Sequence, residues 1–476
     1  MAKAASNLAS SSVSSLREAF TGLKSLKARY STAATTAASS RTIHTWRKAI
    51  YLYPFQGVLR LLPPAAVLAA GLLIRAYFAP FTVGSDVVQF AGFADSVHRH
   101  GLCFYKYAGG ENAEAEGWAY PWPFPYGPLA VALLAVARLL APGAVEKVGE
   151  WVYAPPDWIV ASKALFIAFD TAVAVLIYSN GAGWPTWRRT AAMALYYLNP
   201  AVIYTSAIYG MLDPLPAALL IAALRLRGGF WAGALLGLAA ATKLNAAPAA
   251  LFAALASPSL RLAAGFAAGA LVPVMPFEAA CPGSLLAWVH AALSVASPGY
   301  NPPVVYSFNG VTTLATYLHE KTGGDYLWAI RAWWVAAAAA YAPLLLVARR
   351  AGPLASAYLA YLAYTATYWR VNYQYFLLLA GLAALHIAAP GVSRAEKAVS
   401  LAHLAAVALW PFLYPVSWWA RVHVKEPNEA VATALDAVSL KLLDPEVYVA
   451  YSLALTALAY VALAAHYRRW FKRINP

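Results

Sequence analysis

The chain has 476 residues, of which 61% are hydrophobic and only 12% are charged, and its mean hydropathy is +0.56. A soluble protein carries roughly 25% charged residues, so this composition excludes an ordinary soluble globular protein. The formal net charge is +15, but Lys and Arg stand beside apolar segments instead of forming one basic face. This distribution is typical of membrane anchors under the positive-inside rule and argues against nucleic-acid binding.

Residues 1–57 differ from the rest of the chain, because they are basic, rich in Ala, Ser and Thr, and contain Glu18 as their only acid. From Val13 to Leu26, apolar residues recur at helical spacing among basic ones. This pattern predicts a short amphipathic helix on an anionic cytoplasmic leaflet. An organelle transit peptide and a disordered basic tail fit the same composition, and both alternatives stay open.

Apolar segments long enough to cross a bilayer, roughly 20 helical residues each, follow this basic segment. We expect spans at about 58–80 and 126–142, separated by a polar loop at 81–125. Residues 157–278 contain apolar segments broken by polar residues and prolines, and a second polar loop is expected at 279–325. Five later spans are expected at 326–348, 353–369, 371–389, 396–419 and 445–467.

The expected fold class is therefore an all-α polytopic membrane protein of about 11–13 transmembrane helices, with both long loops extracytoplasmic and the C-terminus inside. The arginines at 188–189 and 225–227 fit this alternation poorly, so the number of helices between 157 and 278 stays open. Cys103 and Cys281 fall in the two loops on the same side. They either form a disulfide between the loops or are two separate small apolar residues.

The first polar loop carries a candidate functional carboxylate. A helix is expected to begin at Gly84-Ser85-Asp86, and at 100° per residue Asp86 and Gln89 share its apolar face, whereas Asp95 points toward solvent. A carboxylate directed inward at a membrane surface is costly unless it is paired or used. Asp86 is therefore a candidate functional residue, and the alternative is a helix cap with Gln89 as its capping-box partner.

The segment 120–129 enters the second expected span with prolines at alternate positions, which exclude a helix and predict an extended aromatic rim that includes Tyr126. This rim either stacks on a sugar or anchors the span. Farther along, Arg370 and Tyr373 lie in an aromatic segment at the start of a later span. Arg370 either binds a phosphate in bidentate fashion or anchors the interface.

Four further charged residues are expected within or at the ends of membrane helices. Asp213 either caps the following helix or lines a polar cavity, and Lys243 either snorkels to the interface or binds an anion. Lys163 and Asp170 lie on one face of the third span, as partners or as independent cavity residues.

In this order, these segments resemble the membrane glycosyltransferases of the GT-C superfamily, which use polyprenyl-phosphate sugars. The resemblance covers about 58–390, and the nearest relatives look like dolichyl-phosphate-mannose-dependent mannosyltransferases. Their first loop often contains Asp-X-Asp, whereas this chain has Gly84 at the first position. The resemblance is carried by Gly84-Ser85-Asp86, Phe90, Asp95, residues 101–105, residues 120–129, Leu198-Asn199-Pro200, residues 209–213, Lys243 and residues 371–376.

The resemblance implies inverting transfer of a hexose, expected to be mannose, from a polyprenyl or dolichyl phosphate to a lipid-linked glycan or protein. Asp86 matches the general base, and Arg370 is the first candidate for the donor phosphate. No cofactor is expected to be required, with a divalent cation as the open alternative. The other candidate substrate-binding residues are Arg75, Lys243, Asp213, Asp95, Gln89, Tyr126 and Tyr373.

The resemblance also implies a division of the chain and a location. Residues 58–390 are expected to form the catalytic module and 391–476 to add C-terminal helices and a basic cytoplasmic tail. The expected location is the plasma membrane of a prokaryote or the endoplasmic reticulum of a eukaryote, with membrane lipids as partners and an extracytoplasmic active site. A multi-pass transporter or lipid flippase and a non-catalytic assembly subunit are the alternative functions.

Overall fold

The computed structural model describes residues 61–226, 228–298, 307–439 and 444–472. The chain divides into two compact units, Met1–Pro63 and Pro64–Pro476, and every helix and strand from η1 (Ala79–Phe81) onward belongs to the second. The amphipathic helix expected within 1–57 lies outside the described residues.

Helices dominate the described residues, which confirms the all-α polytopic fold class. Five helical segments among them are long and apolar enough to cross a bilayer: Leu61–Phe81, Pro156–Asn180 (α5), Leu260–Ala280, Trp328–Ala351 and Pro445–Phe471 in α22 (Pro445–Lys472). The third comprises α11 (Leu260–Leu271), η6 (Val272–Val274) and α12, and the fourth comprises α15 (Trp328–Arg331) and α16 (Trp333–Ala351). Other helices of the bundle are α6 (Thr186–Tyr197), α8 (Pro214–Arg225), α9 (Phe230–Thr242), α10 (Ala247–Ala256), α17 (Pro353–Thr367), α18 (Tyr375–Ala388) and α19 (Arg394–Leu413).

At the interruption expected at Asn199-Pro200, α6 ends and a second, short helical segment follows directly. The Asn199 side chain accepts a hydrogen bond from the backbone N–H of Ala201 and so caps α7 (Pro200–Ile203), which continues into a π-helical turn, η4 (Tyr204–Tyr209). Gly210 then adopts φ +89°, a conformation that favours glycine, and ends the turn. The chain therefore turns back here, at the start of α8.

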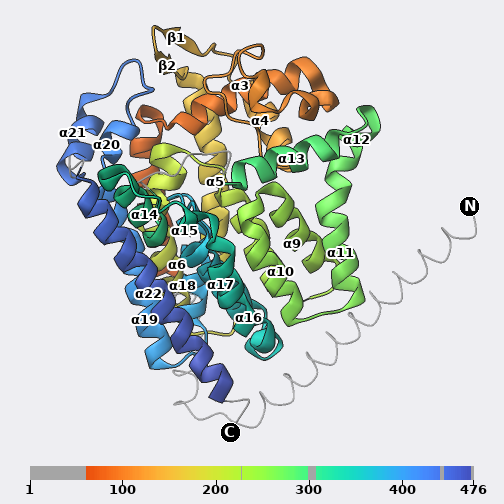
Figure 1. Cartoon of the computed structure of the whole chain (residues 1–476), viewed down its shortest axis with the longest axis vertical. Helices are drawn as coiled ribbons and strands as arrows, with labels where there is room; N and C mark the ends of the chain where they lie inside the picture. Colours follow the sequence, from red (N-terminus) through yellow and green to blue (C-terminus); the bar gives the residue numbers. More distant parts are fainter. Residues whose placement is uncertain (1–60, 227, 299–306, 440–443, 473–476) are drawn as a thin grey trace, which may run out of the picture. The chain divides into compact units, whose positions relative to one another are not determined.

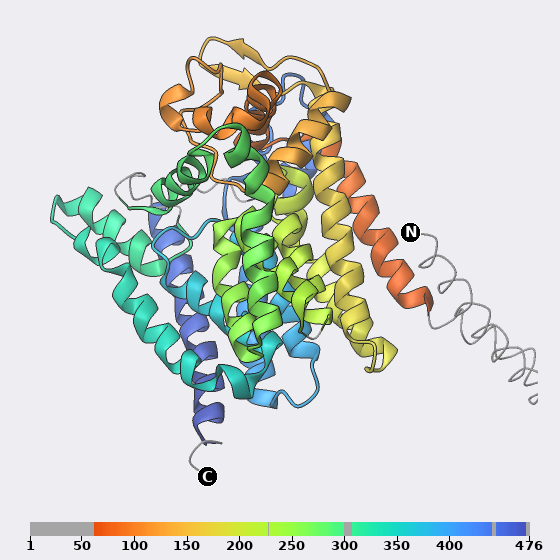
Figure 2. The same cartoon turned by 90° about the vertical axis from the view of Figure 1, so that its right-hand side faces the viewer.

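The segment expected to be the second span, 126–142, forms a shorter helix. α4 (Pro128–Leu140) has 13 residues, which at 1.5 Å per residue is about 20 Å, short of the roughly 30 Å hydrocarbon core. It packs against α3 (Ser85–His100) and α5. Figures 1 and 2 show α3 and α4 together at one end of the bundle, so α5 makes the return crossing.

Because α5 and not α4 makes the return crossing, the arginines at 188–189 and 225 now agree with the alternation of membrane sides along the chain. Arg189 donates to the carbonyl of Tyr178 and Arg225 to that of Ser179, so both lie at the end of α5. Figure 2 shows this end of α5 at the same end of the bundle as the C-terminal ends of α16 and α22, which carry further Arg residues. We call this the basic end of the bundle, and the opposite one the loop end.

The loop end is built from α3, α4, two 3-10 helices, a small hairpin and two helices that follow α11. The hairpin was not predicted; its strands β1 (Glu146–Val148) and β2 (Trp151–Tyr153) pair antiparallel with Glu146 opposite Tyr153. The expected loop 279–325 also contains helices. The remaining elements are η2 (Gly101–Tyr107), η3 (Gly110–Asn112), η5 (Leu244–Ala246), α12 (Met275–Ala280), α13 (Ser284–Ala296), α14 (Gly310–Thr322), α20 (Val416–Trp419) and α21 (Glu429–Val438).

A disulfide joins Cys103 in η2 to Cys281 at the end of α12, with their Cα atoms 5.3 Å apart. Of the two alternatives for these cysteines, the disulfide is therefore the one present. It links the first polar loop to the end of α12 across 178 residues of sequence.

We expect the double variant Cys103→Ser/Cys281→Ser to lower the thermal unfolding temperature in detergent, because the disulfide restricts the unfolded chain, typically by about 2–4 kcal/mol. Maleimide labelling of denatured, unreduced wild-type protein should detect no free thiol. Labelling of both cysteines without reductant would contradict the bridge.

Candidate functional site

The beginning of α3 is fixed against the membrane helices at Gly84. Its backbone N–H donates to the carbonyl of Tyr209 at 2.7 Å, and the neighbouring Val83 N–H donates to the carbonyl of Ala420 at 2.7 Å. A Cβ on Gly84 would lie 2.2 Å from the Tyr209 ring. The ring thus fills the space beside residue 84, so a larger side chain at this position would require Tyr209 to move.

Asp86 is the second residue of α3 and does not act as its cap. The N-cap is Gly84, with no side-chain capping hydrogen bond, so the cap alternative is wrong. Burial raises the pKa of the Asp86 carboxyl, and the positive charge of Lys243 and a hydrogen bond from Tyr209 counteract part of that rise. The residue as a whole is half-buried. Asp86 is thus a half-buried residue whose carboxylate has increased basicity.

Asp213 and Lys243 form a buried ion pair next to Asp86. Lys243 Nζ lies 2.6 Å from Asp213 Oδ2, and their side chains are 10% and 2% exposed. Asp213 occupies the N-cap position of α8, but its side chain makes no capping hydrogen bond and pairs with Lys243 instead. The rings of Tyr126 and Tyr375 lie 5.4 and 5.7 Å from Lys243 Nζ. The lysine charge is therefore enclosed by one carboxylate and two aromatic faces, and it also acts on Asp86.

Arg370 lies just before α18 and brings a second positive charge to this region. Tyr375 is within electrostatic range of both Arg370 and Asp213. Among the described residues, Arg370 has no carboxylate within ion-pair distance, and its buried Nε has no hydrogen-bond partner. Its guanidinium is therefore available to an anionic ligand.

Tyr126 and Tyr373 also reach the cluster. Tyr126 contributes the ring beside Lys243 and packs edge-on against Phe90. Tyr373 packs edge-on against Tyr209, with ring centroids 5.1 Å apart. The structure thus brings together Asp86, Tyr126, Asp213, Lys243 and Tyr373, with Arg370 within electrostatic range of Tyr375.

Two of the other candidate residues are held in separate ion pairs. Arg75 lies 2.7 Å from Asp170 Oδ2, both fully buried, and its guanidinium stacks 3.9 Å from the Tyr197 ring centroid. Asp95 pairs with Arg138 through contacts of 2.7 and 3.0 Å. Because each charge already has a partner, these two residues are not joined to the Asp86 cluster.

The remaining two residues hold backbone segments together. Lys163 is independent of Asp170: it donates to the Thr82 hydroxyl at 2.9 Å and to the Ile208 carbonyl at 2.6 Å. Gln89 binds the backbone at Tyr120 and Trp122. Both therefore act on the segments that flank Asp86.

Sequence reasoning missed Tyr209, Asn245 and Tyr375 as members of the site. Asn245 donates to the Tyr361 hydroxyl at 3.3 Å and more weakly to Asp213 at 3.5 Å, and its buried Oδ1 has no hydrogen-bond partner. The polar residue directly after Lys243-Leu244 was the available signal for Asn245. The aromatic residues gave none, because aromatic residues are frequent throughout this chain.

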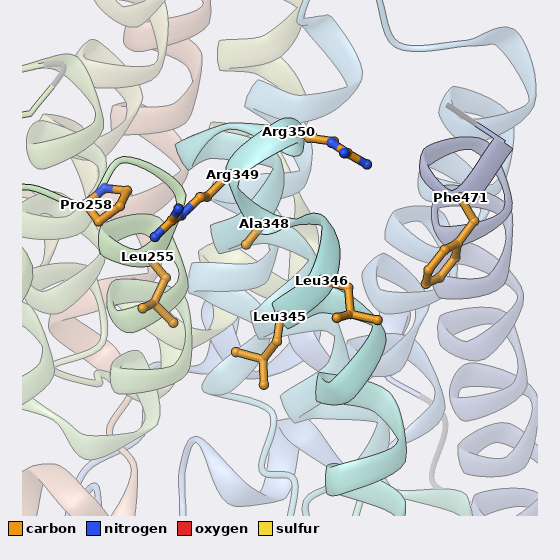
Figure 3. A pocket seen from close by; sticks show the side chains of 8 residues that line it. All are labelled: Leu255, Pro258, Leu345, Leu346, Ala348, Arg349, Arg350 and Phe471. Carbon is orange, nitrogen blue, oxygen red and sulfur yellow. The ribbon is translucent and has the colours of Figure 1, made fainter. Parts of the chain in front are cut away.

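A pocket of about 710 Å³ lies at the basic end and is separate from this cluster. Figure 3 shows Arg349 on the side of Leu255 and Pro258, and Arg350 on the side of Phe471. The residues that line it are Leu255, Pro258, Leu345, Leu346, Ala348, Arg349, Arg350 and Phe471. It contains no carboxylate and therefore no counterpart to Asp86. The described residues also contain no group of three or more His, Cys, Asp or Glu side chains placed to hold a metal ion.

At one end of a polytopic helical bundle, the structure thus places a half-buried carboxylate, a buried ion pair and an arginine that has no ion-pair partner among the described residues. The family model for glycosyltransferase family 87 matches residues 124–368. This is more than half of the chain, which therefore belongs to glycosyltransferase family 87 and is a membrane glycosyltransferase of the GT-C type. A comparison with curated proteins gives no match. The matched region contains Asp213 and Lys243, whereas Asp86 precedes it and Arg370 follows it.

Gly84→Ala should lower the unfolding temperature, because its Cβ would overlap the Tyr209 ring, an overpacking cost of about 1–3 kcal/mol. Adding Tyr209→Ala should recover part of that loss, since the two changes share one contact. Gly183→Ala, where a Cβ meets nothing within 4 Å, is the matched control. Strictly additive effects of Gly84→Ala and Tyr209→Ala in thermal unfolding would contradict the contact.

Lys243→Met should destabilise the protein by about 3–5 kcal/mol, because Asp213 would remain buried without its partner. The double variant Lys243→Met/Asp213→Leu should recover most of this loss. Lys425→Met is the control, since its pair with Glu146 is exposed and its attraction is screened by solvent. Equal unfolding temperatures for Lys243→Met and Lys425→Met would show that the buried pair is not formed.

Proposed function

We propose that this enzyme transfers a hexose, specifically mannose, from a polyprenyl- or dolichyl-phosphate sugar to a hydroxyl of a lipid-linked glycan or protein, with inversion at the anomeric carbon. The observation that carries the proposal is the convergence of Asp86, the Asp213–Lys243 pair and Arg370 at one end of a family 87 fold. The choice of mannose and of a lipid phosphate rests on the resemblance of the sequence motifs to dolichyl-phosphate-mannose-dependent enzymes.

In the proposed reaction Asp86 is the general base. Its carboxylate takes the proton of the acceptor hydroxyl while the acceptor oxygen forms a bond to the anomeric carbon. The bond between that carbon and the phosphate oxygen breaks, and the electron pair leaves with the lipid phosphate. Because burial raises the pKa of Asp86, the carboxylate is a stronger base than a solvated one. Lys243 and Tyr209 keep it ionised enough to act.

The leaving phosphate needs positive charge, because negative charge builds up on its oxygen as the bond breaks. Arg370 can supply this charge, since no described carboxylate neutralises it and its planar guanidinium matches two phosphate oxygens. Lys243 is already paired with Asp213, so we assign it the indirect part of setting the charge of Asp86.

We propose that the loop end faces the extracytoplasmic side, which is the periplasmic side of a plasma membrane or the lumen of the endoplasmic reticulum. The Arg residues gathered at the opposite end support this orientation, because cytoplasmic ends of membrane proteins are enriched in Lys and Arg. The disulfide at the loop end also supports it, because disulfides persist in oxidising compartments.

Asp86→Asn should lower kcat for sugar transfer by about 100-fold or more, because Asn cannot accept the proton. Asp95→Asn, which alters the separate pair with Arg138, is the matched control and should keep most of the activity. Radiolabelled polyprenyl-phosphate mannose and a panel of acceptors give the measurement. Full activity of Asp86→Asn would remove Asp86 as the base.

The pH dependence should follow the ionisation of Asp86. Only the deprotonated carboxylate can act, so transfer should be lost as the pH falls through the pKa of Asp86. That midpoint should lie above the ordinary value of 3.8, because burial raises the pKa. An acid limb at or below 3.8 in kcat would contradict the assignment. We also propose that no divalent cation is needed, so activity should be unchanged in EDTA, and a loss that added Mg²⁺ or Mn²⁺ restores would contradict this.

A further inference from the structure

Two aromatic rings near Asp86 have no part in the donor chemistry described above. Tyr120 and Trp122 stack with ring centroids 4.8 Å apart and planes inclined by 22°. Tyr120 is partly exposed and Trp122 is 42% exposed. An exposed stacked pair on a stiff, proline-rich segment presents a flat apolar surface whose position is fixed before any ligand arrives.

Gln89 fixes this surface relative to Asp86. Its side-chain amide donates to the carbonyls of Tyr120 at 2.8 Å and Trp122 at 3.3 Å, and its Oε1 accepts from the Tyr120 N–H at 2.9 Å. Gln89 follows Asp86 by three residues in α3, so the two side chains lie on the same helix face one turn apart. The position of the aromatic pair relative to the Asp86 carboxylate is therefore fixed by α3, which carries both Asp86 and Gln89.

His423 holds the same surface from the other side. Its Nδ1 lies 2.8 Å from the Val152 carbonyl, which can only accept, so Nδ1 carries the proton and Nε2 accepts from the Tyr120 hydroxyl at 3.0 Å. Burial lowers the pKa of His423 and so favours this neutral form. The position of the Tyr120 ring is thus determined by α3, by the hairpin and by the segment after α20.

The contacts of Gln89 place Tyr120 one helical turn along α3 from Asp86. Burial, and second the negative charge of Asp86, raise the pKa of Tyr120, in agreement with this placement. A donor phosphate would be repelled by Asp86 and attracted by Arg370, which comes from a different segment. The group that must lie against Asp86 is instead the neutral acceptor hydroxyl.

We propose that Tyr120 and Trp122 form the acceptor subsite, where a sugar ring of the acceptor stacks on the aromatic pair and presents its hydroxyl to Asp86. Sugar rings carry an apolar C–H face that packs on aromatic side chains, while their hydroxyls remain free for polar contacts. This assignment rests on the proposed function and adds that the acceptor is itself a glycan. Gln89 acts through the two rings and is a positioning residue.

The test is steady-state transfer by the full-length enzyme in nanodiscs, with donor and acceptor concentrations varied separately. Trp122→Ala should raise the KM for a glycan acceptor about tenfold, a loss of about 1.4 kcal/mol, while the donor KM stays within about twofold. Trp122→Phe should restore most acceptor affinity. Gln89→Leu should raise the acceptor KM with unchanged donor KM, as expected if it only positions the rings.

The control is Trp151→Ala, which removes a comparably exposed tryptophan from the hairpin at the same end of the molecule. Unchanged acceptor KM in Trp122→Ala, or the same reduction of protein yield in both tryptophan variants without a kinetic change, would overturn the subsite and make Trp122 a membrane anchor. Absence of transfer by the wild-type enzyme with every donor would overturn the proposed function itself, before any variant is compared.

Discussion

The close approach of Gly84 to Tyr209 is the contact on which the site depends. It joins the loop end to the membrane helices through a backbone hydrogen bond, and it is possible only because residue 84 has no side chain. Lys163 strengthens the same junction, since its buried ammonium binds Thr82 on one segment and Ile208 on the other. Asp86 follows this junction directly, so its position is set by the fold and not by a mobile loop.

The charged residues of the bundle fall into two groups that differ in their pairing. Arg75 with Asp170 is a fully buried pair, and Tyr196 and Ser206 complete the hydrogen bonds of its carboxylate. Such satisfied pairs can persist in a membrane protein and leave little capacity for a ligand. In the Asp86 cluster, Lys243 pairs with Asp213 and acts on Asp86 only through its charge, and Arg370 has no described ion-pair partner. The site therefore differs from the structural ion pairs in that one of its charges, on Arg370, is not balanced by a described carboxylate.

The sequence predicted the fold class and several residues of the site, because both depend on local patterns. Long apolar runs indicate helices, and a carboxylate on an apolar helix face indicates either a cap or a function; the structure decided for Asp86 against the cap. The partners of Arg75 and Lys243 could not be predicted, since each lies far away in the sequence and is brought near only by tertiary packing.

The error in the crossing order has a similar physical origin. Residues 126–142 are apolar enough for a span, but α4 is too short to cross, and one of its faces packs against α3 and α5. Hydropathy does not distinguish these two environments. The arginines near the end of α5 indicated this error in the sequence itself. Counting α4 as a membrane span put them on the extracytoplasmic side, and without that span they fall on the cytoplasmic side.

The central claim is that Asp86 and Arg370 act on opposite partners of one transfer reaction. The most direct measurement is an experimental structure of the enzyme with a non-hydrolysable polyprenyl-phosphate sugar. We expect the phosphate within hydrogen-bond distance of Arg370, and the anomeric carbon with its free face, opposite the phosphate, directed toward Asp86. A phosphate bound at Arg349 and Arg350 of the basic end, with the sugar away from Asp86, would contradict the account.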